Sequence, residues 1–159
     1  MSESKFKTMR HIETVRNYLS LIRSELGDRS ILHDQSKLES PEVEIFEEYT
    51  PKLRGVTYGS DEYKQMMKEM KVAVDHHQSK NRHHPEYFKT GIWGMNLVDL
   101  IEMICDWKAA GLRHNDGDLI RSIEINQDRF GYSDELKSIL INTAQWINGV
   151  TVYHKAEES

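Results

Sequence analysis

The sequence has few features of a secreted or membrane-spanning protein. Cys105 is the only cysteine among 159 residues, which excludes an internal disulfide framework and is typical of a reducing compartment. No apolar run approaches the roughly 20 residues that cross a bilayer. The first ten residues, MSESKFKTMR, also lack the apolar region of a signal peptide. These absences predict a soluble, cytoplasmic protein without a membrane partner.

An excess of positive charge is also missing. Lysine and arginine total 21 against 26 acidic residues, a formal net charge of -5. The chain therefore has no overall positive field to drive nonspecific nucleic-acid binding. Large apolar side chains are present, however, including three Trp, seven Tyr, four Phe and seven Met. They predict a single domain over residues 1–159, with one hydrophobic core and short flexible ends.

Apolar residues recur at steps of three and four, which is the spacing of amphipathic helices. The first stripe predicts a helix that ends at Gly27, and its members are Ile12, Val15, Leu19, Ile22 and Leu26. Pro51 should bend or end the second helix, and typical N-caps are Ser60 or Asp61, Asn96 and Ser133. We expect helices over residues 4–26, 41–50, 60–79, 96–111, 118–129 and 133–146. The predicted fold is an all-α, single-domain bundle of about six helices.

Eight histidines, six of them before position 85, suggest a metal site. His77 falls within the apolar stripe of its predicted helix and should point inward, whereas His76 falls on the flank. His11 lies at the edge of the first helix's stripe and can also face the interior. For each of these side chains, a hydrogen bond to a buried carbonyl or carboxylate is the alternative to metal ligation.

The pair His33-Asp34 lies in a short segment between the first two helices. A neutral imidazole beside a carboxylate supplies two metal ligands from one turn, and the aspartate has two oxygens with which to bridge two cations. Lys37 follows three residues later and can reach an anionic oxygen at the same metals if a helix starts here. An aspartate that caps a turn beside a solvated lysine is the plainer alternative.

Three carboxylates, Asp99, Glu102 and Asp106, share one face of the predicted helix over 96–111. They can serve as metal ligands or as proton-transfer groups, although a solvated acidic face has the same spacing. Asp106 precedes Trp107, which should be buried, so we expect Asp106 at the edge of a pocket. Glu102 is the candidate for proton transfer.

These residues form an ordered series along the chain: His11, His33-Asp34, His77 or His76, His83-His84 and Asp106. The series resembles the H, HD, H, HH and D ligand order of binuclear HD-domain metal-dependent phosphohydrolases, and HDQSK is similar to their HD-x-x-K signature. The resemblance implies an HD-like fold that holds one or two divalent transition metals, such as Mn, Fe, Zn, Co or Ni. It implies that Asp34 bridges the metals and that Lys37 contacts phosphate. The ligands it implies are His11, His33, Asp34, His77, His83, His84 and Asp106, with the choice among His76, His77, His83 and His84 left open.

Nearly the whole chain, about residues 10–145, also resembles a bacterial and phage domain family of unknown function. The motifs that carry this resemblance are YGSDEY, HHQSKNRHHPEYF, EMICDWKAA and RHNDGD. It implies that polar groups near the carboxyl end belong to the site, where arginine could bind phosphate oxygens through two parallel hydrogen bonds. The proposed substrate-binding residues are Arg113, His114, Ser122, Asn126 and Arg129. A polar helix face with an arginine capping carbonyls is the alternative.

The expected function is hydrolysis of a small phosphorylated molecule, a nucleotide or a related phosphate ester, by a metal-activated water. The same ligands would suit a second chemistry, since some HD-fold proteins hold a mixed-valent di-iron centre that activates oxygen. A non-catalytic helical module that binds a nucleotide or a partner protein is the third alternative. A homo-oligomer is among the assemblies that the sequence allows.

Overall fold

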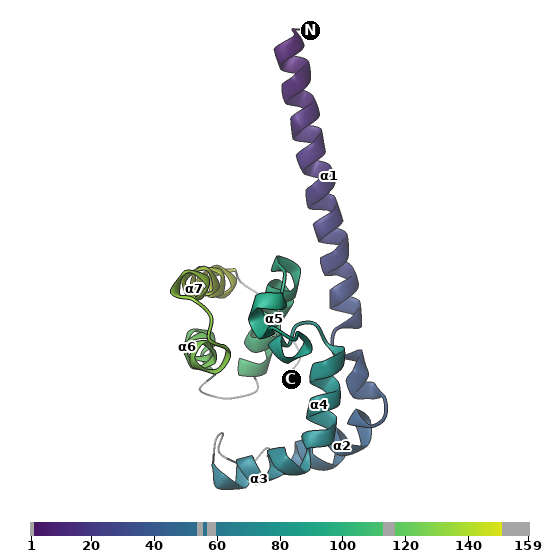
Figure 1. Ribbon diagram of the computed structural model, residues 1–159, viewed down its shortest axis with the longest axis vertical. Coiled ribbons are helices and arrows are strands. Elements are labelled where there is room, and N and C mark those ends of the chain that lie inside the picture. Colours follow the sequence, from purple (N-terminus) through teal and green to yellow (C-terminus); the bar gives the residue numbers. More distant parts are fainter. Residues whose placement is uncertain (1, 54–55, 57–59, 113–116, 151–159) are drawn as a thin grey trace, which may run out of the picture.

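A computed structural model of the chain describes residues 2–53, 56, 60–112 and 117–150 (Figure 1). Within these residues the chain forms seven α-helices, three short 3-10 helices and no strand, which confirms the all-α prediction. The α-helices are α1 (Glu3–Leu32), α2 (Glu42–Leu53), α3 (Asp61–Glu69), α4 (Lys71–Lys80), α5 (Leu97–Gly111), α6 (Leu119–Phe130) and α7 (Asp134–Gly149). The 3-10 helices are η1 (Gln35–Leu38), η2 (Pro85–Tyr87) and η3 (Gly91–Gly94). None of the described helices combines the length and apolar character needed to span a membrane.

Three predicted helix boundaries were wrong. The second helix, expected over 41–50, continues through Pro51 to Leu53. The helix expected over 60–79 is divided at Met70, whose φ of -79° and ψ of -1° turn the chain between α3 and α4. The first helix continues through Gly27 to Leu32. Gly27 does not adopt the positive φ with which glycine usually ends a helix, since the positive-φ glycines among the described residues are Gly91 and Gly131.

The expected N-caps do begin three of the helices. Ser60 and Ser133 accept hydrogen bonds from the first turns of α3 and α7. Asn96 and Asp99 form a reciprocal capping box at α5, in which Asn96 Oδ1 accepts from the Asp99 N–H at 3.0 Å and Asp99 Oδ2 accepts from the Asn96 N–H at 2.9 Å. This box fixes the first turn of α5, the helix from which two residues of the site project.

The α5 helix lies between the lower end of α1 and the pair formed by α6 and α7 (Figure 1). Its apolar side forms the hydrophobic core with those two helices, and the fully buried members include Met103, Ile104 and Ile123. The α2, α3 and α4 helices lie together near the carboxyl end of α1 (Figure 1). The candidate site lies where α1, α4 and α5 meet.

The N-terminal part of α1 extends beyond the other helices (Figure 1). Every residue from 2 to 25 is exposed. The stripe expected to pack into the core is therefore largely outside it, with Leu19, for example, 60% exposed. The stripe was correctly located, but no other element of the described chain lies beside most of it.

Candidate metal centre

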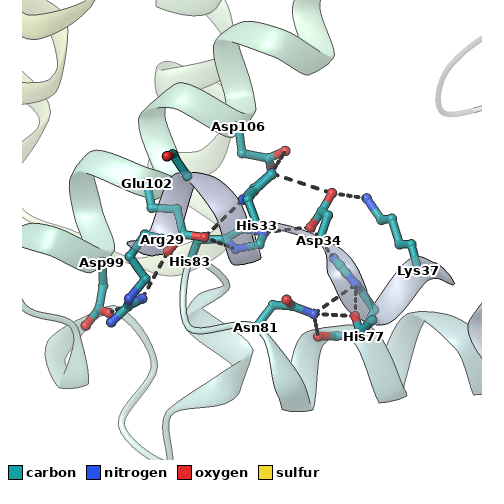
Figure 2. Close-up of polar contacts among 12 residues, drawn as sticks. Arg29, His33, Asp34, Lys37, His77, Asn81, His83, Asp99, Glu102 and Asp106 are labelled. Carbon is teal, nitrogen blue, oxygen red and sulfur yellow. Dashed lines mark hydrogen bonds and ion pairs between the residues drawn. The ribbon is translucent and has the colours of Figure 1, made fainter. Parts of the chain in front are cut away.

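Histidines and aspartates from four segments converge at one point (Figure 2). The segments are the end of α1, the turn into η1, the last turns of α4 with the loop that follows, and α5. Ligand atoms of one group all lie within 4.8 Å of one another, and its members are Asp34, His77, His83 and His84. A second group meets the same distance limit and contains His33, His83 and Asp106. The structure therefore brings together six of the seven ligands expected from the sequence.

Asp34 is the centre of this arrangement. Its φ of 58° is the only positive value among the described non-glycine residues, and such conformations are uncommon and concentrate at functional sites. Asp34 Oδ1 lies 3.2 Å from His77 Nε2 and 3.4 Å from His83 Nε2, while Oδ2 lies 3.6 Å from His33 Nε2. The carboxylate thus faces three imidazole nitrogens.

Four polar atoms of the site are buried and have no hydrogen-bond partner among the described residues, namely Asp34 Oδ1 and the Nε2 atoms of His77, His83 and His84. Although His77 and His83 lie close to Asp34, these contacts lack hydrogen-bond geometry. Buried polar groups in proteins are nearly always paired, and each unpaired one costs about 1–3 kcal/mol. A cation among these four atoms would satisfy all of them at once.

Glu102 on α5 lies behind two of the imidazoles. Its Oε1 is 3.0 Å from His33 Nδ1 and 3.1 Å from His83 Nδ1. Because an ionised carboxylate can only accept, each Nδ1 donates, so in the neutral form of each ring the lone pair is on Nε2, the nitrogen that faces Asp34. Glu102 Oε2 accepts from Arg29 Nη1 at 3.0 Å. With both oxygens engaged, Glu102 is placed to orient ligands, while its expected role in proton transfer stays a prediction.

Glu42, at the start of α2, lies behind His76 and His77 in the way that Glu102 lies behind His33 and His83. It is fully buried, and its oxygens accept from His76 Nδ1 at 2.7 Å and from His77 Nδ1 at 2.9 Å. His77 is buried and His76 is half-buried, as the helical spacing indicated. The sequence analysis missed Glu42. A signal existed, because Glu42 lies on the same helical stripe as Phe46, where a solvated glutamate is not expected.

The charges of the cluster shift the pKa values of its members. The proximity of Asp106 and the hydrogen bond to Glu102 raise the pKa of His33 to about 10. Burial would raise the pKa of Asp34, but His77 and Lys37 outweigh it and hold that pKa well below its usual range. Burial, reinforced by His83 and His77, lowers the pKa of His84 to about 3. The cluster thus keeps an ionised carboxylate and a neutral imidazole ready to bind a cation.

Lys37 lies at the outer side of the cluster. Its Nζ donates to Asp34 Oδ2 at 2.5 Å, and the ammonium is 5.9 Å from the centre of the Phe46 ring. The side chain is 35% exposed, so it can contact both the carboxylate and solvent. The three-residue step thus places Lys37 beside Asp34, while its expected contact with phosphate stays a prediction.

The acidic face of α5 is turned inward. Asp99 is fully buried and accepts two hydrogen bonds, both 3.0 Å long, from Nε and Nη2 of Arg82. Arg29 Nη1 lies 3.3 Å from Oδ1 of the same carboxylate. By contrast, Leu97, the first residue of the same helix, is 75% exposed. The solvated acidic face considered as an alternative is therefore excluded for Asp99, which joins α5 to α1 and to the loop after α4.

His11 is not part of the cluster, and its prediction as a ligand was wrong. It is exposed on α1, 22 residues before His33. At a rise of about 1.5 Å per residue, the two histidines are roughly 33 Å apart along the helix. The sequence could not show this, because the helix was expected to end at Gly27, which would have allowed the chain to fold back.

The described members of the expected anion-binding set near the carboxyl end, Ser122, Asn126 and Arg129, are not assembled into a free site. Arg129 Nη2 is paired with Glu86 Oε1 at 2.7 Å, and Ser122 Oγ donates to the Asp118 carbonyl at 3.0 Å. Asn126 is half-buried on the same helix, α6. Arg113 and His114 lie outside the described residues, so their predicted role stays a prediction.

Comparison with known proteins gives the family of the chain and no activity. No curated protein and no solved structure matches it significantly. One family model matches residues 1–150, which is nearly the whole chain, and it describes a family of unknown function. The chain therefore belongs to the family of unknown function DUF5662.

Proposed function

We propose that this chain is a metal-dependent phosphohydrolase that acts on a nucleotide or a related small phosphate ester. The observation that carries the proposal is the convergence of four buried, unpaired ligand atoms on one point, with carboxylates behind the imidazoles. An arrangement in which a carboxylate orients a histidine toward a metal is typical of metal sites. A merely structural histidine cluster would have its nitrogens paired within the protein.

The donor set fits one or two divalent transition metals. His77, His83, His84 and Asp34 Oδ1 would hold the first ion. His33 Nε2 lies 3.6 Å from both Asp106 Oδ1 and Asp34 Oδ2, and His33 and Asp106 would hold a second ion. Imidazole nitrogen with carboxylate oxygen suits Mn, Fe, Co, Ni and Zn, whereas an all-oxygen site would favour Mg or Ca.

The protein groups divide the remaining work of phosphate hydrolysis. A bound divalent cation supplies a water of lowered pKa and polarises a phosphoryl oxygen. Lys37, partly exposed beside Asp34, binds the anionic oxygens of the substrate and stabilises the charge that develops on them. Glu42 and Glu102 keep the Nε2 lone pairs of His77, His33 and His83 directed inward.

The test is a phosphate-release screen of the full chain, loaded in turn with each of the five metals. The substrates are nucleoside mono-, di- and triphosphates and small phosphate esters. We expect release with at least one combination, and its loss in Asp34→Ala and His83→Gln. Oxygen consumption by the iron-loaded chain, without phosphate release from any substrate, would contradict the proposal in favour of an oxygenase. A chain that retains no metal would contradict it in favour of a binding module.

Lys37→Met tests the substrate contact separately from metal binding. We expect roughly a 100-fold lower kcat with unchanged metal content, because one charged group would be lost from the developing anion. Lys71→Met is the matched control, since Lys71 pairs with Asp75 on an exposed face of α4 at 2.5 Å, much as Lys37 pairs with Asp34. Equal kcat in the Lys37 variant and the control would contradict this role for Lys37.

A further inference from the structure

The exposed part of α1 carries several large apolar side chains that face solvent. Six large apolar side chains, each between 42% and 60% exposed, occur between positions 6 and 22: Phe6, Met9, Ile12, Val15, Leu19 and Ile22. Isolated helices are marginal in water, and helices in proteins depend mainly on packing of an apolar face. The exposed length of α1 therefore points to a partner that covers it.

The spacing of these residues indicates what kind of surface would fit. Ile12, Val15, Leu19, Ile22 and Leu26 follow steps of three, four, three and four, and we call them the α1 stripe. This is the heptad spacing of a helix that packs against another helix. The same steps continue to Arg29 and His33, whose side chains contact α5. The α1 stripe is thus the continuation of a helix-packing face that the described chain covers only at its carboxyl end.

We propose that the α1 stripe packs against the α1 stripe of a second copy, so that the protein is a homodimer with antiparallel α1 helices. Each copy supplies the same heptad surface, which is the condition for a two-fold symmetric interface. This inference is independent of the proposed phosphohydrolase activity. It concerns a part of α1 that lies outside the metal cluster.

The position of α5 favours the antiparallel arrangement. This helix occupies the packing face of α1 at Arg29 and His33. In a parallel pair, both copies would place α5 at the same end of the interface, where the partner helix would need that space. In an antiparallel pair, the other helices of the two copies, α2 to α7, lie at opposite ends of the interface. Each α1 helix then packs against the exposed part of its partner's α1.

Charge favours the same arrangement. Residues 3–32 contain six basic and four acidic residues, a net charge of +2, while the whole chain carries -5. The rest of the chain therefore carries -7. The positive excess of α1 lies in residues 3–16, which contain four Lys or Arg and two Glu. An antiparallel pair brings this basic half of each α1 helix toward the acidic remainder of the other copy.

The apolar area of the stripe is a large part of what an interface needs. If each of the five residues of the α1 stripe contributes up to about 100 Å², the stripe offers on the order of 500 Å² per copy. A standard stable interface buries about 800 Å² per partner, and the stems of flanking lysines and arginines add to the apolar part. A pair of α1 helices can thus reach the size of a specific interface.

The experiment measures the molar mass of the full chain by light scattering and sedimentation over a concentration series. We expect a dimer for the wild type and a monomer for the double variant Leu19→Glu/Ile22→Glu, with a dissociation constant at least 100-fold higher. Leu21→Glu is the matched control, because Leu21 is 65% exposed on α1 but lies away from the stripe. It should remain dimeric. In all three proteins, the thermal unfolding of the helices packed around α5, followed by circular dichroism, should have the same midpoint.

Three results would overturn the proposal. The first is a monomeric wild type at tens of micromolar, and the second is a double variant that stays dimeric. The third is a monomeric wild type that cosediments with phosphatidylserine-containing vesicles through the α1 stripe, which would assign the helix to a lipid surface. Small-angle scattering of the dimer tests the relative orientation of the two α1 helices. Helices α2 to α7 of the two copies at opposite ends support the antiparallel pair, and the same helices side by side contradict it.

Discussion

Two glutamates in this protein each hold two imidazoles, and the geometry of the site depends on them. Glu102 accepts from His33 and His83, and Glu42 accepts from His76 and His77. A carboxylate behind a ligating histidine fixes its tautomer and raises its basicity. If the cluster binds metal as proposed, Glu42 and Glu102 would set its affinity without touching the ion.

Glu42→Gln tests this role at the level of one atom. Glutamine has a single acceptor oxygen, so it can accept from only one of the two Nδ1 atoms, and its amide would face the other. We expect metal affinity to fall roughly 10- to 100-fold, measured by competition with a chelator. Glu47→Gln, an exposed change on the same helix, is the control. Equal affinities in the two variants would show that Glu42 does not position His77.

The metal-free protein should lose stability as the pH rises from about 7 to 10. Asp106 and Glu102 raise the pKa of His33 from 6.5 to about 10 in the folded chain. A raised pKa means that the ion pair contributes fully below pH 6.5 and is lost as the pH passes through 10. Urea denaturation in excess chelator measures the change, and His33→Gln should flatten it. A wild type as stable at pH 10 as at pH 7 would contradict the assignment.

Among the elements, α1 differs most from its sequence-based prediction. Its periodicity correctly located an apolar stripe, but periodicity identifies a face and not what covers that face. The same limit applies to α5, where the acidic face is buried against Arg29 and Arg82. Caps were more predictable, because a cap such as Asn96 depends only on its neighbours in the chain.

Gly27 provides a test of the continuous α1 helix. It lies inside the helix, and a Cβ built at this position meets no atom within 4 Å. Gly27→Ala should therefore stabilise the protein by about 0.5–1 kcal/mol, because alanine favours the helix more than glycine does. The measurement is the free energy of unfolding in urea.

Gly131 is the matched comparison for that change. It caps α6 with a φ of 67°, where an alanine side chain is strained although space is open. Gly131→Ala should destabilise the protein by about 1 kcal/mol. A destabilising Gly27→Ala would instead indicate that α1 breaks at residue 27.

At the scale of the whole molecule, the site joins segments that are distant in sequence. His33 and Asp34 follow α1, His77 is on α4, His83 precedes η2, and Asp106 is on α5. The sequence indicated these five residues through their order and their resemblance to a known ligand pattern. It could not indicate Glu42 as a shared partner of two histidines, because that contact spans 34 and 35 residues and depends on how α2 packs against α4.

The central claim is that this cluster holds metal. The most direct measurement is the metal content of the full chain, determined by mass spectrometry after loading and removal of free ions. We predict one or two ions per chain for the wild type and a large loss in both Asp34→Ala and His83→Gln, with helical content retained. A wild type that retains no metal, or variants that retain as much as the wild type, would contradict the account.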